Sequence, residues 1–168
     1  CPTMTRAPFV YDYGDTSRYT PLLPMYSLGH DFVPPPIHAG GLRYHGMAPT
    51  VSQLAVEGLI QPKSVNQIDS YRAGLLWART EGVIPAPETS NALAQVVIEA
   101  EKAREEGKQK VIVACFSGHG LLDLAAYEKF MTGNLTDVVL EESEIQRACR
   151  TCEGHPVPKI LSRHSFDG

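Results

Sequence analysis

The sequence has 168 residues, 43% of them hydrophobic and 20% charged, with a formal net charge of -4 at pH 7. This composition is typical of a globular domain and excludes a disordered chain, a collagen-like rod and a coiled coil. The acidic balance disfavours a nucleic-acid partner, and no apolar run is long enough for a membrane span. Sparse cysteines and the lack of a signal segment predict a reducing, cytoplasmic location.

Residues 1–49 are rich in proline and glycine and lack a clear periodicity. Three consecutive prolines at 34–36 form a stiff, extended step, and the glycine pair at 40–41 follows it. A segment of this length without periodicity is improbable as an independent unit, so we expect it to wrap over a surface. The chain does not begin with Met, so we expect that surface to belong to a longer protein.

The pattern becomes helical after residue 49. Thr50 is expected to cap a short helix that ends near Gly58. A second helix is predicted from Ser64 or Asn66 to Gly82, because its apolar residues recur at three- and four-residue steps. A third is predicted over residues 88–106, after a loop rich in proline.

Residues 110–116, with the sequence KVIVACF, are predicted to form a buried strand. A continuous β-branched run is typical of a strand covered on both faces of a mostly parallel sheet. A tight turn and a helix over residues 121–131 follow, which favours an α/β fold with three layers, a mostly parallel sheet flanked by helices. One strand is too few for such a sheet, so we expect the chain to be part of a larger fold. Residues 133–168 contain a weaker helix at 141–150 and a polar tail.

Ser117, Gly118 and Glu88 are candidate site residues. Ligands of α/β sheets collect where a strand ends and the next helix offers free N–H groups, which is the predicted place of Ser117 and Gly118. The alternative is a glycine-rich turn in which Ser117 caps the helix. A hydrolase is disfavoured, because a nucleophile elbow needs glycine where Cys115 stands. Glu88 opens a helix, so its carboxylate either faces a pocket beside the preceding loop or only interacts with the helix dipole.

A flexible loop places a cation, a phenol and an imidazole together, in Arg43, Tyr44 and His45. The guanidinium group binds carboxylates through two parallel hydrogen bonds, which suits a substrate loop. The alternative is a surface loop whose arginine pairs with an acidic neighbour.

Two cysteines near the C-terminus have the spacing of zinc ligands. Cys149 and Cys152 are three positions apart, and His155 and His164 follow them. The sequence has no second pair of this kind, so we favour a fraying C-terminal tail and predict no metal. Walker and GxGxxG loops are also absent from the sequence, which leaves no nucleotide motif.

Three separated motifs resemble the C-terminal part of the tryptophan synthase β chain family, whose members are fold-type II pyridoxal-phosphate enzymes. The motifs are AGGLRYHG at 39–46, EGVIPAPE at 81–88 and FSGHG at 116–120. The segments YSLGH from Tyr26 and LRYHG from Leu42 make the chain most similar to the divergent second type. The resemblance covers about residues 5–132. It divides the chain into a wrapping and substrate-loop segment (1–49), an α/β portion of the cofactor-binding fold (50–132) and a poorly matching tail (133–168).

The resemblance implies an enzyme that joins L-serine or O-phosphoserine to indole with pyridoxal 5'-phosphate and yields L-tryptophan. The implied site residues are Ser117 and Gly118 at the pyridine nitrogen of the cofactor, Glu88 for proton transfer, and Arg43, Tyr44 and His45 on the substrate side. A neutral serine would not keep the pyridine nitrogen protonated, which favours β-replacement over transamination. The resemblance also implies a homodimer, a possible α subunit as partner, and a monovalent cation held by carbonyls of the substrate loop.

Two departures from the family pattern matter. Arg43 stands where better-known β chains carry an aspartate, which leaves the amino-acid donor open between serine and an anionic relative. The family's Schiff-base lysine, in a His-Lys-x-Asn stretch, and its glycine-rich phosphate loop are missing from this sequence. We therefore expect the isolated chain to be inactive. Two alternatives are another fold-type II lyase, such as a serine or threonine dehydratase, and a non-catalytic α/β interaction module.

Overall fold

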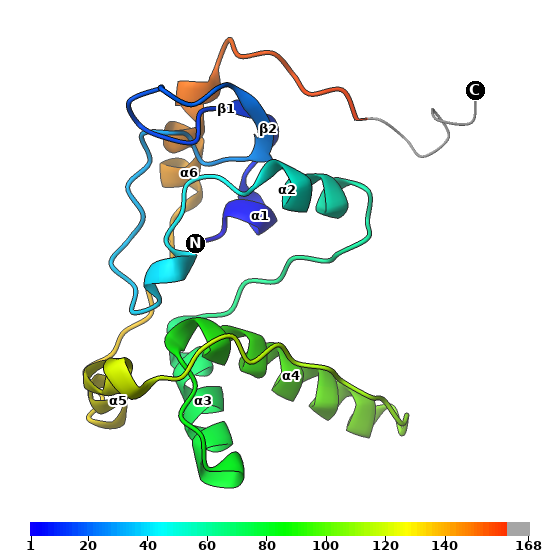
Figure 1. Ribbon diagram of the computed structural model, residues 1–168, viewed down its shortest axis with the longest axis vertical. Helices are drawn as coiled ribbons and strands as arrows, with labels where there is room; N and C mark the ends of the chain where they lie inside the picture. Colours follow the sequence, from blue (N-terminus) through cyan, green and yellow to red (C-terminus); the bar gives the residue numbers. More distant parts are fainter. Residues whose placement is uncertain (161–168) are drawn as a thin grey trace. The chain divides into compact units, whose positions relative to one another are not determined.

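The computed structural model describes residues 1–160, and Figure 1 labels the helices and strands along the chain. The chain divides into two compact units. The first unit comprises Cys1–Pro35, Tyr44–Ser64 and the described residues from Leu140 onward; the second comprises Pro36–Arg43 and Val65–Val139. Each unit has a hydrophobic cluster of its own.

The first unit is built on an antiparallel hairpin of β1 (Phe9–Asp12) and β2 (Leu23–Tyr26). In its register Phe9 lies opposite Tyr26, and Asp12 lies opposite Leu23. A two-stranded hairpin is only marginally stable in water, so helices must cover it. Helix α2 (Pro49–Val56) packs against β2, and the 3-10 turn η3 (Arg150–Cys152) packs against β1. The unit also contains α1 (Thr3–Arg6) and α6 (Glu142–Cys149).

The helices of the first unit begin where local chemistry favours a start. Helix α2 begins at Pro49 rather than after Thr50, because proline is preorganised for the first helical position and lacks the N–H that would be unsatisfied there. The predicted Thr50 cap is therefore wrong. Helix α6 begins with a capping box. The Glu141 side chain accepts a hydrogen bond from the Glu144 N–H, and the Glu144 side chain accepts one from the Glu141 N–H.

The second unit consists of helices. They are α3 (Gln67–Glu81), α4 (Pro87–Glu105) and α5 (Leu124–Met131), with the 3-10 turns η1 (Gly40–Leu42) and η2 (Leu121–Asp123). Helix α3 ends at Gly82, whose φ of 74° is the left-handed conformation that glycine adopts most readily. The predicted helices over 64–82, 88–106, 121–131 and 141–150 are confirmed to within a few residues at their ends.

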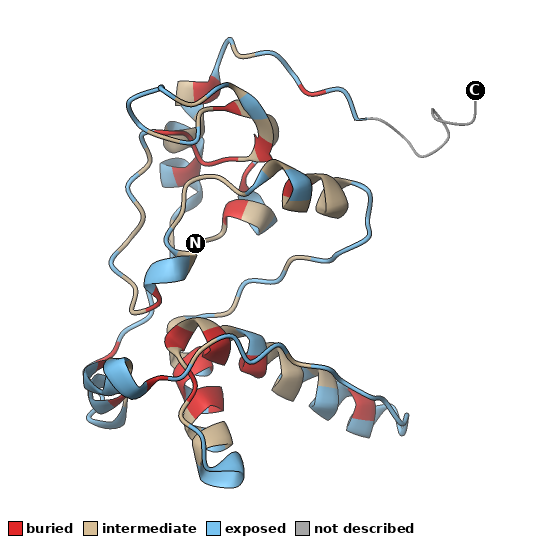
Figure 2. Cartoon of the chain, viewed as in Figure 1, coloured by how far each residue is buried: buried red, intermediate tan, exposed pale blue. Residues whose placement is uncertain are grey.

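Two buried clusters hold these helices together. Ala73 of α3 packs with Leu93 and Ala94 of α4, and Tyr71 of α3 packs with Tyr127 of α5. Figure 2 shows buried positions in the first half of α3 and in the first turns of α4. The same first turns of α4 carry the candidate site residue Glu88, so the packing fixes that residue's position.

Gly74 lies where α3 meets α4 and α5. A Cβ atom at this position would lie 2.5 Å from both Ser90 Oγ and Tyr127 Oη. We expect Gly74→Ala to lower the free energy of unfolding by about 1–3 kcal/mol, because the crowding outweighs the helix propensity of alanine. Urea unfolding of the 168-residue chain, followed by circular dichroism, measures the change. Gly40→Ala is the control, because a Cβ there meets nothing within 4 Å; equal stability of both variants would contradict the expectation.

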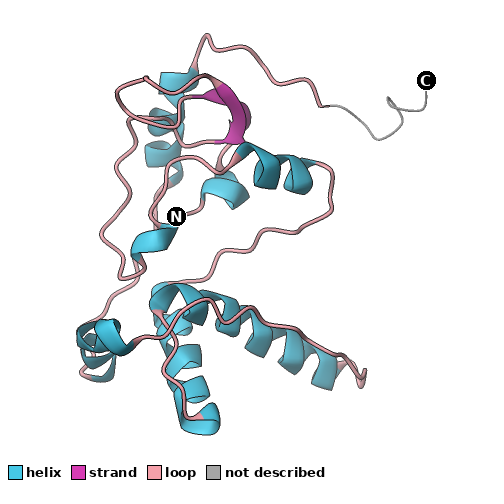
Figure 3. Cartoon of the chain, in the orientation of Figure 1, coloured by secondary structure: helices cyan, strands magenta, loops and turns pink. Residues whose placement is uncertain are grey.

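The strand predicted over residues 110–116 is wrong for the chain as the structure describes it. This segment has no regular secondary structure and no ladder partner, and Val111 and Val113 are 91% and 87% exposed. A strand forms only where neighbouring backbone groups take up its hydrogen bonds, and the other described residues offer none to this segment. The predicted three-layer parallel sheet is therefore not seen in residues 1–160, whose sheet is the pair β1–β2. Figure 3 shows β1 and β2 as strands and the segment after α4 as loop.

None of the helices within residues 1–160 combines the length and the apolar character that a membrane span requires.

Candidate functional site

The glycine-rich turn at residues 117–120 is fastened to the loop before α4. The Ala86 N–H donates to the Gly118 carbonyl at 2.8 Å, and the Gly120 N–H donates to the Ile84 carbonyl at 2.8 Å. Pro85 and His119 form an isolated antiparallel bridge between these bonds. Two of the motifs recognised in the sequence are thus adjacent in space.

Close packing explains the two glycines of this turn. A Cβ atom on Gly120 would collide with the Pro85 carbonyl, and one on Gly118 would lie 3.2 Å from the Ala86 Cβ. Only a residue without a side chain allows the two segments to approach so closely at Gly120.

Thr89 connects the turn to the first turn of α4. Its Oγ1 lies 2.9 Å from Ser117 Oγ and accepts a hydrogen bond of 3.0 Å from the Gly118 N–H. Thr89 is 1% exposed, whereas the Ser117 residue is exposed. The sequence analysis did not find Thr89; its only signal was its place next to Glu88 at the start of a helix.

This arrangement determines which hydrogen bonds the Ser117 hydroxyl can make. The structure does not use Ser117 as a helix cap, because η2 begins at Leu121, whose N–H donates to the His119 ring. The Thr89 hydroxyl has a single proton, which goes either to the Gly118 carbonyl, 3.2 Å away, or to Ser117 Oγ. Only in the second arrangement does the Ser117 proton remain free for an acceptor outside the turn. The predicted capping alternative is therefore wrong, and Ser117 can donate to a ligand when Thr89 donates to Ser117.

Glu88 lies in the first turn of α4 and is half-buried. Its Oε1 accepts a hydrogen bond of 2.8 Å from the Gly41 N–H in η1. The positive end of the α4 dipole also favours a carboxylate here. The structure thus brings Glu88 together with the glycine loop that precedes Arg43, and the Arg43 side chain is exposed.

Tyr44 and His45 belong to the first unit. The Tyr44 carbonyl accepts a 2.9 Å hydrogen bond from Thr3 Oγ1, and burial raises the pKa of the Tyr44 phenol. His45 Nε2 donates to the Tyr13 carbonyl at 2.9 Å. Their predicted contacts with substrate remain predictions.

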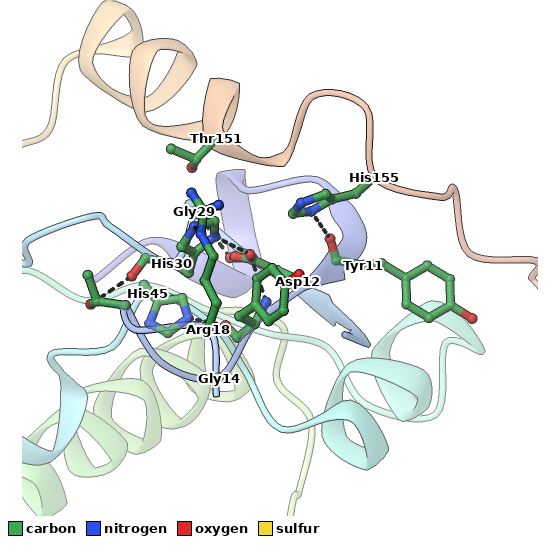
Figure 4. Close-up of polar contacts among 12 residues, drawn as sticks. Tyr11, Asp12, Gly14, Arg18, Gly29, His30, His45, Thr151 and His155 are labelled. Atoms are coloured by element: carbon green, nitrogen blue, oxygen red, sulfur yellow. Dashed lines mark hydrogen bonds and ion pairs between the residues drawn. The ribbon is translucent and has the colours of Figure 1, made fainter. Parts of the chain in front are cut away.

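A buried polar cluster in the first unit was not found by the sequence analysis. Figure 4 shows Asp12 at its centre. Asp12 is fully buried and accepts hydrogen bonds from the Tyr13 N–H at 2.8 Å, from Ser27 Oγ, and from His30 Nδ1 at 2.7 Å. Burial raises the pKa of Asp12, but the bonds from Ser27, His30 and Tyr13 lower it by more, so the carboxyl group stays ionised.

Arg18 fixes the tautomer of His30. Its Nε donates to His30 Nε2 at 3.0 Å, and arginine is a donor only. His30 Nε2 must therefore accept, which leaves the proton on Nδ1, where it bonds to Asp12. The ring links the buried carboxylate of Asp12 to the guanidinium group of Arg18.

The segment after α6 is packed rather than frayed as far as His155. Cys152 ends the 3-10 turn η3 (Arg150–Cys152) and is 8% exposed. His155 Nδ1 lies 2.9 Å from the Tyr11 carbonyl of β1. Cys149 Sγ points instead toward the Ser27 carbonyl, at 3.9 Å. His164, the fourth residue of the zinc alternative, lies outside the described residues.

Comparison with curated proteins agrees with the motifs. Over 135 residues the chain is 53% identical to the tryptophan synthase beta chain 2 of Methanothermobacter thermautotrophicus, covering 80% of this chain and 32% of the relative. It is 54% identical over 127 residues to the beta chain 2 of Thermotoga maritima, covering 76% and 30%. This chain is homologous to a C-terminal part of the tryptophan synthase β chain.

The extent of the match limits what it shows. The tryptophan synthase beta chain of Thermococcus onnurineus is 50% identical over 141 residues, 84% of this chain and 32% of the relative. The chain thus spans about a third of the length of the curated relatives it matches. No family model matches it. The predicted resemblance to the tryptophan synthase β family, including its second type, is confirmed.

Proposed function

We propose that this chain forms the C-terminal portion of a tryptophan synthase β-type enzyme, which joins L-serine or O-phosphoserine to indole and yields L-tryptophan. The observation that carries the proposal is the grouping of Glu88, Thr89 and Ser117 around the first turn of α4. Identities of 50–54% to curated tryptophan synthase β chains support it.

Ser117 and its neighbours fit the pyridine ring of pyridoxal 5'-phosphate. An exposed hydroxyl, positioned by the buried Thr89 and not used as a cap, suits a neutral nitrogen acceptor. When bound, the cofactor supplies the electron sink for carbanion chemistry at the amino-acid substrate. Ser117 would orient the ring without adding charge to it, and the Gly118 backbone would lie beside it. The groups that hold the cofactor's aldehyde and phosphate are not in this sequence.

Glu88 is suited to hold and move a proton near the reacting atoms. The Gly41 N–H occupies Oε1 of the carboxylate, and the second oxygen can serve as base or acid toward indole and substrate. The bond to Gly41 also ties the substrate loop to the same helix that carries Thr89.

The substrate side of the site is proposed to include Arg43, Tyr44 and His45. A guanidinium binds phosphate as well as carboxylate through paired hydrogen bonds. This favours O-phosphoserine as a donor, although the family's usual donor is serine. The loop's backbone carbonyls are proposed to contact a monovalent cation.

The proposed enzyme completes the fold with strands that lie outside this chain. Residues 110–116, exposed here, would become a central strand of the three-layer α/β fold of fold-type II enzymes. A homodimer, a possible α subunit and a cytoplasmic location belong to the same proposal.

Arg43→Ala in the complete enzyme tests the choice of donor. We expect kcat/KM for O-phosphoserine to fall by about tenfold or more relative to that for serine, because a phosphate loses a charge-assisted pair of hydrogen bonds. Tryptophan formed from each donor with indole gives the ratio. An equal fall for both donors would show that Arg43 does not recognise phosphate.

Adding pyridoxal 5'-phosphate to the 168-residue chain tests whether the chain alone contains a lysine that forms a specific Schiff base with the cofactor. None of its lysines lies in a His-Lys-x-Asn stretch. We expect no absorbance band beyond those of the free cofactor. After borohydride reduction, we expect mass spectrometry to find no specific lysine adduct. The list of lysines to inspect is Lys63, Lys102, Lys108, Lys110, Lys129 and Lys159. A stoichiometric adduct at one of them would overturn the expectation.

A further inference from the structure

Three side chains with different ligand atoms converge beside the β1–β2 hairpin. The carboxylate of Asp12, the thiol of Cys152 and the ring of His155 place one ligand atom each within 4.8 Å of one another. Asp12 and Cys152 are buried, and His155 is half-buried. Asp12 ends β1, whereas Cys152 and His155 come from the segment after α6.

The backbone prepares His155 to act as a ligand. Its Nδ1 lies 2.9 Å from the Tyr11 carbonyl, and a carbonyl only accepts, so Nδ1 carries the proton. In the neutral ring, Nε2 then holds an unprotonated lone pair. Figure 4 shows this hydrogen bond between the His155 ring and the Tyr11 carbonyl. In metal sites a histidine ligand typically donates the N–H of its other ring nitrogen to such a carbonyl, which fixes the tautomer and the orientation of the ring.

The hydrogen bonds of Asp12 also orient its carboxylate as a ligand. Its two oxygens accept hydrogen bonds from Tyr13 N–H, Ser27 and His30, which hold the carboxylate in one orientation. Such partners behind a ligand are usual in metal sites. Without a cation, burial and the nearby Asp12 carboxylate raise the pKa of the Cys152 thiol to about 12.

We propose that Asp12, Cys152 and His155 bind a divalent ion of the zinc type. A mixed oxygen, sulfur and nitrogen set matches the ligands that zinc takes in proteins. Tetrahedral zinc, with bonds of about 2.0–2.3 Å, holds ligand atoms about 3.3–3.8 Å apart. The three ligand atoms lie within 4.8 Å of one another, so they need to approach by at most about 1.5 Å. Three protein ligands leave the fourth position for water. The ion links the segment after α6 to β1, and this role is independent of the proposed enzymatic activity.

The ligand set differs from the one that sequence spacing alone suggests. Cys149 Sγ points to the Ser27 carbonyl and is not a member of the cluster. This makes Cys149 a matched control, because it is a second cysteine, half-buried, one helical turn before Cys152.

Titration of the 168-residue chain with Co²⁺ tests the proposal, in a reductant that contains no thiol. We expect saturation at one ion per chain, a near-ultraviolet band from thiolate-to-cobalt charge transfer, and displacement by Zn²⁺. Cys152→Ser should abolish the band, and His155→Asn should weaken binding by about tenfold or more. Cys149→Ser should bind as the unchanged chain does.

Thermal unfolding with and without Zn²⁺ keeps the test decisive if a variant folds poorly. Zinc should raise the Tm of the unchanged chain and of Cys149→Ser, since a ligand that binds only the folded state stabilises it, and a chelator should reverse the rise. The absence of saturable binding to the unchanged chain would overturn the proposal. So would full binding by Cys152→Ser, or a loss in Cys149→Ser as large as that in Cys152→Ser.

Discussion

Asp12→Ala is expected to lower the free energy of unfolding by about 3–5 kcal/mol, the usual cost of removing one member of a buried, hydrogen-bonded charge network. The substitution leaves the Tyr13 N–H, the Ser27 hydroxyl and the protonated Nδ1 of His30 without their acceptor in a buried site. Urea unfolding of the 168-residue chain in the presence of a chelator measures the loss, so that bound metal does not contribute.

Asp31→Ala is the control for this prediction, because Asp31 is exposed and stands beside His30 in the sequence. Its stability should change by no more than about 0.5 kcal/mol. Asp12→Asn should lose less than Asp12→Ala, because the amide oxygen still accepts. A loss below about 1 kcal/mol for Asp12→Ala would show that the cluster contributes little to stability.

Glu88→Gln in the complete enzyme is expected to lower kcat/KM for tryptophan formation by about 10²–10⁴, the usual contribution of a general acid or base. Glutamine keeps a carbonyl oxygen that can accept from the Gly41 N–H, so the local fold should persist. What is lost is the group that can take up and release a proton. Steady-state kinetics with indole and the amino-acid donor measure the change.

Glu101→Gln is the matched control, because Glu101 lies on the same helix and is exposed. Its kinetics should equal those of the unchanged enzyme. An unaltered kcat in Glu88→Gln would assign Glu88 only the role of holding the glycine loop.

Local signals in the sequence predict the helices well. Gly82 stops α3 with a positive φ, and Pro87 opens α4, each for reasons that a single residue supplies. The prediction of a strand at 110–116 fails because a strand depends on more than its own residues. Its stability requires neighbouring strands, which the described residues do not contain. A pattern of β-branched residues shows that a strand is possible, but not where its partners lie.

The candidate site also contains parts that the sequence predicts and parts that it does not. The link of residues 84–86 to the turn at 117–120 agrees with the motifs, but the part played by Thr89 needed the structure, because a threonine at a helix start has many uses. The Asp12 cluster could not be predicted at all. Asp12 comes from β1, whereas Ser27 and His30 come from the loop after β2. The neighbouring bond between His155 and the Tyr11 carbonyl joins residues 144 positions apart in the sequence.

The product formed from L-serine and indole by the complete enzyme is the most direct test of the central claim, that this chain contributes Ser117 and Glu88 to a tryptophan-forming site. The account predicts L-tryptophan, formed at a rate that depends on indole and falls in Glu88→Gln. Formation of pyruvate alone, at a rate independent of indole, would contradict it and identify a dehydratase instead.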